Sequence, residues 1–335
     1  MNLRSTFSVR THATLRLRLY LATDHNVWLK ALRERVIVRA KLELIAVYCP
    51  NVGETMSIRA HVRLYHELSG LLYLRQPKPD LRILTYHHVP PFLRDALGSQ
   101  LDSISRERSF LRPEDFSNNS TRTSPGVLVT FDDGFESAFR AYEEVLRPRG
   151  IRAIYFVVTG LIGGNTSVVA RHRFLAQLKL SNKKCVSGFD ESQSPMSWEQ
   201  ASQLIGEGNE IGSHSDSHLM LPSLSDREIQ RELVESKVRI ADNTGRVPQH
   251  FALPFGSYDA RVLALAVQEY SFVHLTVHGP NSLSDVQSLL FRETIEPCES
   301  ARFAVALTRG ALDHRSCFRR RCLRACGPQL SDKCV

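Results

Sequence analysis

Two patterns of apolar residues alternate along the chain between residues 81 and 295. A continuous apolar run bounded by Gly126 and Gly134 predicts a buried strand at 127–131, and further strands are expected at 153–158, 210–212, 251–253 and 272–277. Between these strands, apolar residues recur every three or four positions, as on one face of a helix, at 135–146, 198–205 and 229–238. This alternation predicts an α/β protein, either a parallel barrel or an open doubly wound sheet.

Local signals support the predicted helices. Ser197 with Gln200, and Ser225 with Glu228, have the spacing of capping boxes at two helix starts. Gly245 lies just past the end of the second of these helices, where a left-handed residue is expected. Residues 90–125 are polar and rich in serine and arginine, and we expect a long loop there.

Two short motifs contain residues that could bind a metal ion or take part in catalysis. Asp132 and Asp133 directly follow the predicted buried strand at 127–131, and His214 and His218 follow the short strand at 210–212. In a parallel barrel, side chains at the carboxyl ends of strands form the active site. One carboxylate and two neutral imidazoles can hold a divalent metal, and a second carboxylate can accept a proton from water. The spacing therefore favours a metal-dependent hydrolase.

Other interpretations of these motifs are weaker. An aspartate at a helix start caps the helix, but capping explains one of the two acids and not the matched histidine pair. His214-Ser215-Asp216 is similar to part of an oxygenase iron site, but that site needs an all-β fold. An aspartyl-phosphate phosphatase would need its two acids separated by one residue, whereas Asp132 and Asp133 are adjacent.

Composition and charge change the picture mainly at the ends of the chain. The chain has 335 residues and a formal net charge of +8. Residues 1–80 hold 13 Lys and Arg against 6 Asp and Glu, while residues 81–335 hold 30 against 29. The central region is nearly neutral, so we expect no nucleic-acid partner. Three parts follow: a basic, partly helical N-terminal extension (1–79), a catalytic domain (80–310) and a basic, cysteine-rich tail (311–335).

The two extensions offer few functional signals. Residues 28–48 have near-helical apolar spacing interrupted by basic residues, which predicts an amphipathic helix and allows peripheral membrane association. No run has the length of a membrane-spanning segment, and no secretory signal is visible. A cytoplasmic or membrane-peripheral location is therefore favoured. Four of the seven cysteines lie in the tail, which could be a metal knuckle, a lipidated segment or, as we expect, a disordered end.

From about residue 80 to residue 295 the chain resembles the polysaccharide deacetylases, the NodB-like or family four carbohydrate esterases. Thr130-Phe131-Asp132-Asp133-Gly134 resembles the first motif of the family, His214 to His218 the second, and Ala252-Leu253-Pro254-Phe255-Gly256 the third. The resemblance implies a distorted (β/α)7-type parallel barrel. It implies that Asp132 is the general base and that Asp133, His214 and His218 are metal ligands. It also implies that Pro254, Phe255 and Gly256 line the substrate groove and offer a backbone N–H to the oxyanion.

The chain departs from the family pattern in two places. The third motif usually begins with arginine, which orients the base, and here Ala252 stands instead; Arg292 is a candidate replacement, or else part of a surface salt bridge. No late Leu-x-His motif supplies the acid. Instead, a motif near the first strand, Thr85-Tyr86-His87-His88-Val89, resembles the arrangement in the branch of the family that acts on poly-β-1,6-linked N-acetylglucosamine. This resemblance implies that His87 is the acid, and we expect a structural role for His88.

Together these features predict a metal-dependent N-deacetylase that removes acetyl groups from N-acetylated amino sugars. Zinc is the expected metal, although cobalt, nickel, manganese or iron would also suit the ligands. The alternatives are hydrolysis of another non-peptide amide bond on the same scaffold and a catalytically silent saccharide-binding protein. The expected partner is an N-acetylated saccharide, and the oligomeric state is open.

Overall fold

The computed structural model describes residues 81–117, 125–163, 194–281 and 288–326. The predicted N-terminal extension with its amphipathic helix, and the last residues of the tail, lie outside the described residues. Within the described part, no helix combines the length and the apolar character needed to cross a membrane.

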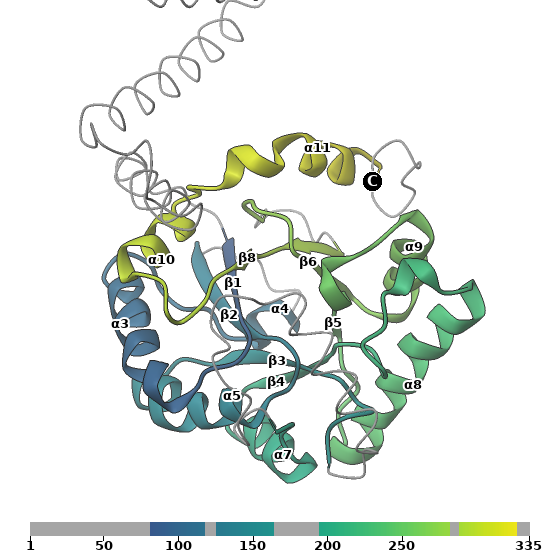
Figure 1. Ribbon diagram of the computed structural model, residues 1–335, viewed down its shortest axis with the longest axis horizontal. Helices are drawn as coiled ribbons and strands as arrows, with labels where there is room; N and C mark the ends of the chain where they lie inside the picture. Colours follow the sequence, from purple (N-terminus) through teal and green to yellow (C-terminus); the bar gives the residue numbers. More distant parts are fainter. Residues whose placement is uncertain (1–80, 118–124, 164–193, 282–287, 327–335) are drawn as a thin grey trace, which may run out of the picture. The chain divides into compact units, whose positions relative to one another are not determined.

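A single sheet of eight parallel strands forms the centre of the described region (Figure 1). Its strands follow the order β7-β6-β5-β4-β3-β2-β1-β8. Their bounds are β1 (Leu81–Tyr86), β2 (Gly126–Phe131), β3 (Ala153–Val157), β4 (Glu210–Ser213), β5 (His250–Ala252), β6 (Phe272–Leu275), β7 (Leu289–Phe291) and β8 (Glu293–Thr294). Sequential neighbours pair directly from β1 to β7, as expected when a helical connection follows each strand.

One stretch of chain joins the two ends of the sheet. Leu289–Phe291 pairs with β6, whereas Glu293–Thr294 pairs with β1 on the opposite edge, and Arg292 lies between the two halves. The sheet is therefore a nearly closed, distorted parallel barrel, and the predicted (β/α)7-type barrel is confirmed. The eighth strand arises because the last strand is divided at Arg292.

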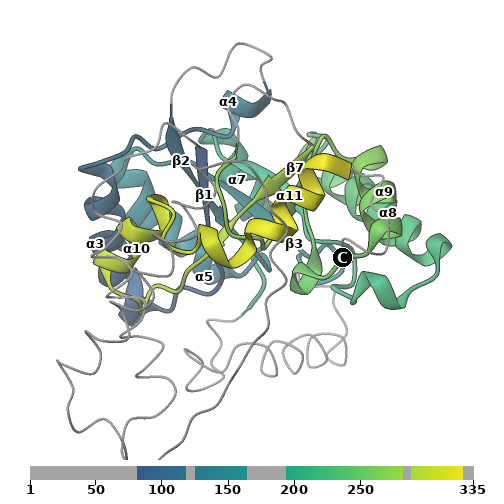
Figure 2. The same ribbon diagram turned by 90° about the horizontal axis from the view of Figure 1, so that it is seen from above.

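Helices surround the strands (Figures 1 and 2). The α-helices are α3 (Arg94–Ser105), α4 (Glu114–Ser117), α5 (Glu136–Ala141), α7 (Trp198–Gly206), α8 (Asp226–Thr244), α9 (Ala260–Glu269), α10 (Ala301–Thr308) and α11 (Cys317–Cys326). After α5 the chain continues in a wider π-helical turn, Tyr142–Leu146. Both predicted capping boxes are present at α7 and α8, and Gly245 ends α8 with a φ of 68°.

The expected loop over residues 90–125 is wrong in its first part, which contains α3. This helix is mostly polar and buries a narrow apolar stripe of Leu97, Leu101 and Ile104. It packs against α10, which lies almost 200 residues further along the chain. Because its partner helix comes from the other end of the domain, the polar composition of α3 concealed it in the sequence.

The core has an inner part and an outer part. Apolar side chains from the strands form the inner cluster: Leu81, Ile83, Leu128, Ile154, Phe156, Ala252, Phe272 and Leu290. Two larger clusters lie between strands and helices, one including α3, α5, α7 and α10, the other α8 and α9. Every residue of β1, β2 and β3 is buried, which explains the apolar runs of β2 and β3.

The tail begins as ordered structure, contrary to the expected disordered end. A 3-10 turn, Asp313–Ser316, leads into α11, and Leu323 of α11 is buried in the cluster that includes α9. Asp313 forms an ion pair with the buried Arg82 of β1, with an N–O distance of 2.6 Å. These contacts attach the start of the tail to the barrel.

Candidate metal centre

Both predicted motifs lie at the carboxyl ends of neighbouring parts of the sheet. Asp132 and Asp133 follow β2, and the loop from His214 to His218 follows β4. Strand β3 lies between them, and its Val157 carbonyl accepts a hydrogen bond from the His214 N–H. Because all these strands are parallel, the two motifs emerge at the same edge of the barrel.

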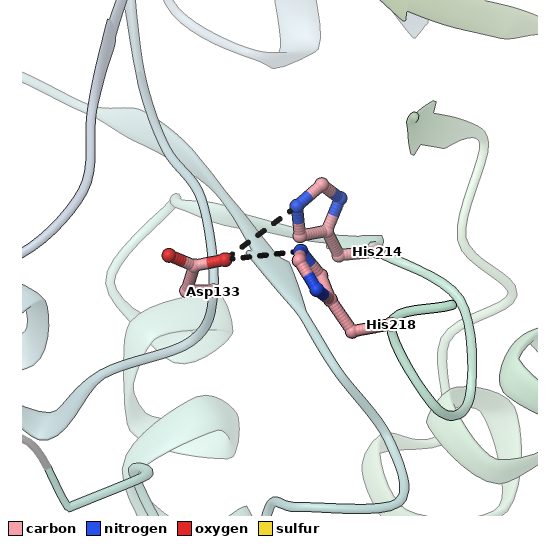
Figure 3. A group of neighbouring side chains, drawn as sticks. All are labelled: Asp133, His214 and His218. Atoms are coloured by element: carbon pink, nitrogen blue, oxygen red, sulfur yellow. Dashed lines mark ion pairs between the residues drawn. The ribbon is translucent and has the colours of Figure 1, made fainter. Parts of the chain in front are cut away.

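Asp133, His214 and His218 converge on one point (Figure 3). The Asp133 Oδ1 atom lies 3.6 Å from His214 Nε2 and 3.5 Å from His218 Nε2. These distances are long for hydrogen bonds, but they are close to the separation of about 3.3 Å between ligands of a tetrahedral ion with bonds of about 2.05 Å. All three side chains are buried. The donor set and its spacing therefore fit a divalent metal ion.

Hydrogen bonding sets which nitrogen of His214 is available. Its Nδ1 atom lies 2.8 Å from the Ala252 carbonyl oxygen, which can only accept, so Nδ1 carries the proton. The Nε2 atom then presents a lone pair toward Asp133. This is the usual arrangement for a metal-binding histidine, in which a carbonyl fixes the tautomer from behind.

The electrostatics of the triad formed by Asp133, His214 and His218 favour a bound cation. Burial raises the pKa of Asp133, and this effect outweighs the attraction of His87 and His214. Among the described residues, the buried Asp133 Oδ2 atom has no hydrogen-bond partner. Burial also lowers the pKa of His218 well below its usual value, so the imidazole is neutral. A buried carboxylate beside the neutral imidazole of His218 would be compensated by a divalent ion.

The second aspartate lies in a different environment. Both oxygens of Asp132 accept hydrogen bonds from Arg292, at 2.7 and 2.9 Å, and both side chains are buried. Burial alone would raise the pKa of Asp132, but Arg292, His214 and His87 outweigh it and lower the pKa to about 2. The salt bridge of Arg292 is thus buried rather than at the surface, and it keeps Asp132 ionised.

The two adjacent histidines after β1 have different surroundings. Burial would lower the pKa of His87, but the nearby carboxylates of Asp133 and Asp132 outweigh this effect and the pKa is raised. The His87 Nδ1 atom is buried and has no hydrogen-bond partner in the part of the chain that the structure describes. His88 instead makes a hydrogen bond to Ser137 Oγ at 2.7 Å and packs against Phe135. His87 therefore interacts electrostatically with both acids, and His88 has structural contacts.

The third motif forms a tight turn beside the triad. The ring of Phe255 lies 4.5 Å from the ring of His218, and its backbone has a φ of 58°. Gly256 also has a positive φ, and a Cβ atom there would collide with Thr276. The Gly256 N–H donates to the Leu253 carbonyl. Since proline has no N–H, Phe255 is the candidate backbone donor of the motif.

Sequence reasoning missed several supporting groups. The Ala252 carbonyl and the ring of Phe156, over which the Arg292 guanidinium lies at 5.2 Å, gave no sequence signal. Glu232 did give one, because it stands in the apolar stripe of α8 between Ile229 and Leu233. An acid at a core position of an amphipathic helix indicates a buried partner.

Comparison with known proteins agrees with this geometry. Residues 119–270 match the family model described as polysaccharide deacetylase. PgdA of Listeria monocytogenes, a peptidoglycan-N-acetylglucosamine deacetylase, is 22% identical over 142 residues, covering 42% of this chain and 24% of PgdA. YxkH of Bacillus subtilis is 23% identical over 237 residues, covering 70% of this chain and 71% of YxkH.

A solved structure has the same fold. The Streptococcus pyogenes deacetylase PplD, determined in complex with acetate, is 21% identical, with a TM-score of 0.54. The similarity covers 69% of this chain and 99% of PplD. By contrast, the chain matches only about a quarter of the length of PgdA. Residues 119–270, which contain the three motifs and the buried triad, thus match the polysaccharide deacetylase family.

Proposed function

We propose that this protein is a metal-dependent N-deacetylase of N-acetylated amino sugars in a poly- or oligosaccharide. Hydrolysis of the acetamide consumes water and yields acetate and a free amine. The observation that carries the proposal is that two adjacent carboxylates have different partners. Asp133 faces the imidazoles of His214 and His218, whereas Asp132 is held ionised by Arg292.

Asp133, His214 and His218 would hold the metal. When bound, a divalent ion supplies Lewis acidity, lowering the pKa of water and stabilising negative charge that develops on oxygen. Zinc is the proposed ion because two imidazoles and one carboxylate with open positions suit it, and cobalt, nickel, manganese and iron are the alternatives.

Asp132 is the proposed general base. Its two oxygens each accept one hydrogen bond from Arg292, and a carboxylate oxygen retains a further lone pair that can take a proton from water. Arg292 is the proposed base-orienting residue in place of the third-motif arginine. Its two parallel hydrogen bonds fix the plane of the carboxylate.

His87 is the proposed general acid. The carboxylates around it favour its protonated form, and the proton passes to the leaving nitrogen as the C–N bond breaks. The Phe255 N–H is the proposed donor to the oxyanion, with Pro254 and Gly256 shaping the turn. An acid at the end of the first strand supports a substrate of the β-1,6-linked N-acetylglucosamine class.

Acetate release from three substrates tests the proposal. Chitooligosaccharides, β-1,6-linked N-acetylglucosamine oligomers and an acetylated aryl amine are incubated with protein that has been depleted of metal and reloaded with Zn²⁺. We expect release from the β-1,6-linked oligomers to be fastest. Release from the aryl amide alone would favour a hydrolase of other amides.

Variants distinguish hydrolysis from saccharide binding. Loss of general base or acid catalysis costs about 10²–10⁴-fold in rate, so we expect Asp132→Asn and His87→Gln to lose that much while still binding the saccharide. Asp133→Ala should lose the metal as well. Wild-type protein that binds the oligomers but releases no acetate with any of the five metals would refute the enzymatic proposal.

A further inference from the structure

The loop that contains both histidine ligands has an unusual backbone. Ser215 and His218 have φ values of 65° and 52°, in the left-handed region that non-glycine residues rarely adopt. The two imidazole rings, 4.8 Å apart, depend on this path to face the same point. The loop therefore needs contacts that hold it in place.

Each of the five backbone N–H groups from His214 to His218 has an identified acceptor. The first three acceptors along the loop belong to neighbouring elements: the Val157 carbonyl for His214, Ser213 Oγ for Ser215 and Glu232 Oε2 for Asp216. The Ser217 N–H also donates to Glu232 Oε2, and the His218 N–H donates to Ser215 Oγ. Glu232 thus accepts hydrogen bonds from the two backbone N–H groups that lie midway between the two histidines.

Glu232 is placed for this contact by α8. Its Oε2 atom lies 3.1 Å from the Asp216 nitrogen and 2.8 Å from the Ser217 nitrogen, and the residue is only 2% exposed. A buried carboxylate in an apolar helix stripe is costly unless donors compensate it. Both of its backbone donors come from the metal-binding loop.

The opposite side of the loop is held by β3 and its following turn. The Thr159 and Gly160 N–H groups donate to the carbonyls of Ser215 and Asp216, at 3.2 and 2.8 Å. Thr159 Oγ1 also donates to Asp216 Oδ1 at 2.7 Å. Two carbonyl groups of the loop are therefore held by the turn after β3. Two N–H groups of the loop are held from α8 by the Glu232 Oε2 atom.

We propose that Glu232 is a positioning residue for the metal centre: its carboxylate sets the backbone of the histidine loop and thereby the affinity for the ion. The inference rests on the proposed metal site but not on the substrate. It assigns to α8, which contributes no ligand, control over the separation of the two imidazoles.

The test measures Zn²⁺ affinity of the metal-depleted full chain by competition with a chromophoric chelator. Glu232→Leu removes the acceptor at similar volume, and Glu232→Asp withdraws it by one methylene. We expect both to bind Zn²⁺ about 10–100-fold more weakly, the usual effect of losing a group that supports a ligand. Glu232→Gln keeps an acceptor oxygen and should bind within about threefold of wild type.

A matched control and a spectrum separate positioning from general stability. Glu235, on the same helix, is exposed, and Glu235→Leu should leave the affinity unchanged. The visible spectrum of the Co²⁺-loaded protein should change in Glu232→Asp and not in Glu232→Gln. Circular dichroism checks that each metal-free variant is folded.

Three outcomes overturn the inference or its basis. Wild-type affinity in both Glu232→Leu and Glu232→Asp would exclude a positioning role, and Glu232→Asp decides alone if Glu232→Leu does not fold. A Glu232→Gln protein as weak as Glu232→Leu would exclude the hydrogen-bond explanation. Wild-type protein that binds no divalent ion would instead refute the proposed metal function.

Discussion

At the scale of single residues, backbone strain is concentrated in the site. Within the described residues, the non-glycine residues with positive φ are Asp133, Ser215, His218 and Phe255. Such conformations cost about 1–3 kcal/mol each and persist where the surroundings enforce them. All four belong to the three motifs, so the strain coincides with the candidate ligands and the turn beside them. The strained backbone lowers the stability of the fold, but it orients these side chains toward the site.

The Arg292–Asp132 pair yields a prediction on pH dependence. In Arg292→Met the buried Asp132 loses the cation that lowers its pKa to about 2, so its pKa should rise. The acidic limb of the kcat/KM profile should then move upward by at least about one pH unit, with kcat/KM reduced about 100-fold or more at neutral pH. Removing one partner of a buried pair should also destabilise the protein by about 3–5 kcal/mol.

Arg261 provides the control for this prediction. It forms exposed ion pairs with Asp226 and Asp259, and Arg261→Met should change stability by less than about 1 kcal/mol and leave the pH profile unaltered. An unchanged acidic limb in folded Arg292→Met would show that Arg292 does not control the ionisation of Asp132.

At the scale of elements, the turn after β5 depends on one glycine. Gly256→Ala would add a Cβ atom against Thr276 at a residue with φ of 60°. We expect a loss of about 1–3 kcal/mol in the free energy of unfolding and reduced acetate release, because the neighbouring Phe255 would move. Chemical denaturation and the acetate assay measure both effects.

Gly206, at the end of α7, is the matched control. A Cβ atom there would contact nothing within 4 Å, so Gly206→Ala should be neutral or slightly stabilising. Equal stability of the two alanine variants would show that the Gly256 turn tolerates a side chain.

Elements also show where sequence reasoning succeeds and fails. Strands β2 and β3 were predicted within one residue of their bounds, because both are buried on two faces and read as continuous apolar runs. The capping boxes of α7 and α8 were predicted from local spacing alone. Helix α3 was missed because its narrow apolar stripe has meaning only against α10.

At the scale of the whole molecule, metal binding should couple to folding. The triad joins a loop after β2 to a loop after β4, so an ion held there links two parts of the barrel. At a free Zn²⁺ concentration 1,000-fold above Kd, stability should increase by about 4 kcal/mol. Differential scanning calorimetry should show a higher Tm with Zn²⁺ than after chelation, and no such difference in Asp133→Ala. An equal Tm in wild type would contradict this coupling.

Glu210, the first residue of β4, yields a prediction on stability and pH. Burial raises its pKa from 4.5 to about 7, so the folded state binds the proton more tightly than the unfolded state. The contribution of protonated Glu210 to the free energy of unfolding is fully present below about pH 4.5 and is lost as pH rises through about 7. Since 21% of the side chain is exposed, we expect a loss of about 2 kcal/mol over this range.

Glu210→Gln should remove this dependence. Urea unfolding at pH 4.5, 6 and 7.5 should show a smaller decline for the variant than for wild type, with the difference confined to this window. Parallel declines in the two proteins would show that Glu210 titrates normally.

The sequence by itself determined the α/β class and the positions of several strands and helices, because two-face burial and helical periodicity are local properties of the chain. Periodicity left a parallel barrel and an open doubly wound sheet as alternatives, and the barrel was implied by the family resemblance. The sequence also determined the set of ligand types, since Asp132-Asp133 and the histidine pair follow predicted strands directly. These inferences need no knowledge of which distant residues meet.

Only the tertiary structure decided how the acids differ. Arg292 reaches Asp132 across 160 residues because the last strand divides there and pairs with both edges of the sheet. Glu232 reaches the histidine loop because α8 packs beside β4. Burial and closure of the barrel set these contacts. The pKa of each carboxylate follows from its burial and from charged groups that are distant in the chain, with the adjacent Asp132 also raising the pKa of Asp133.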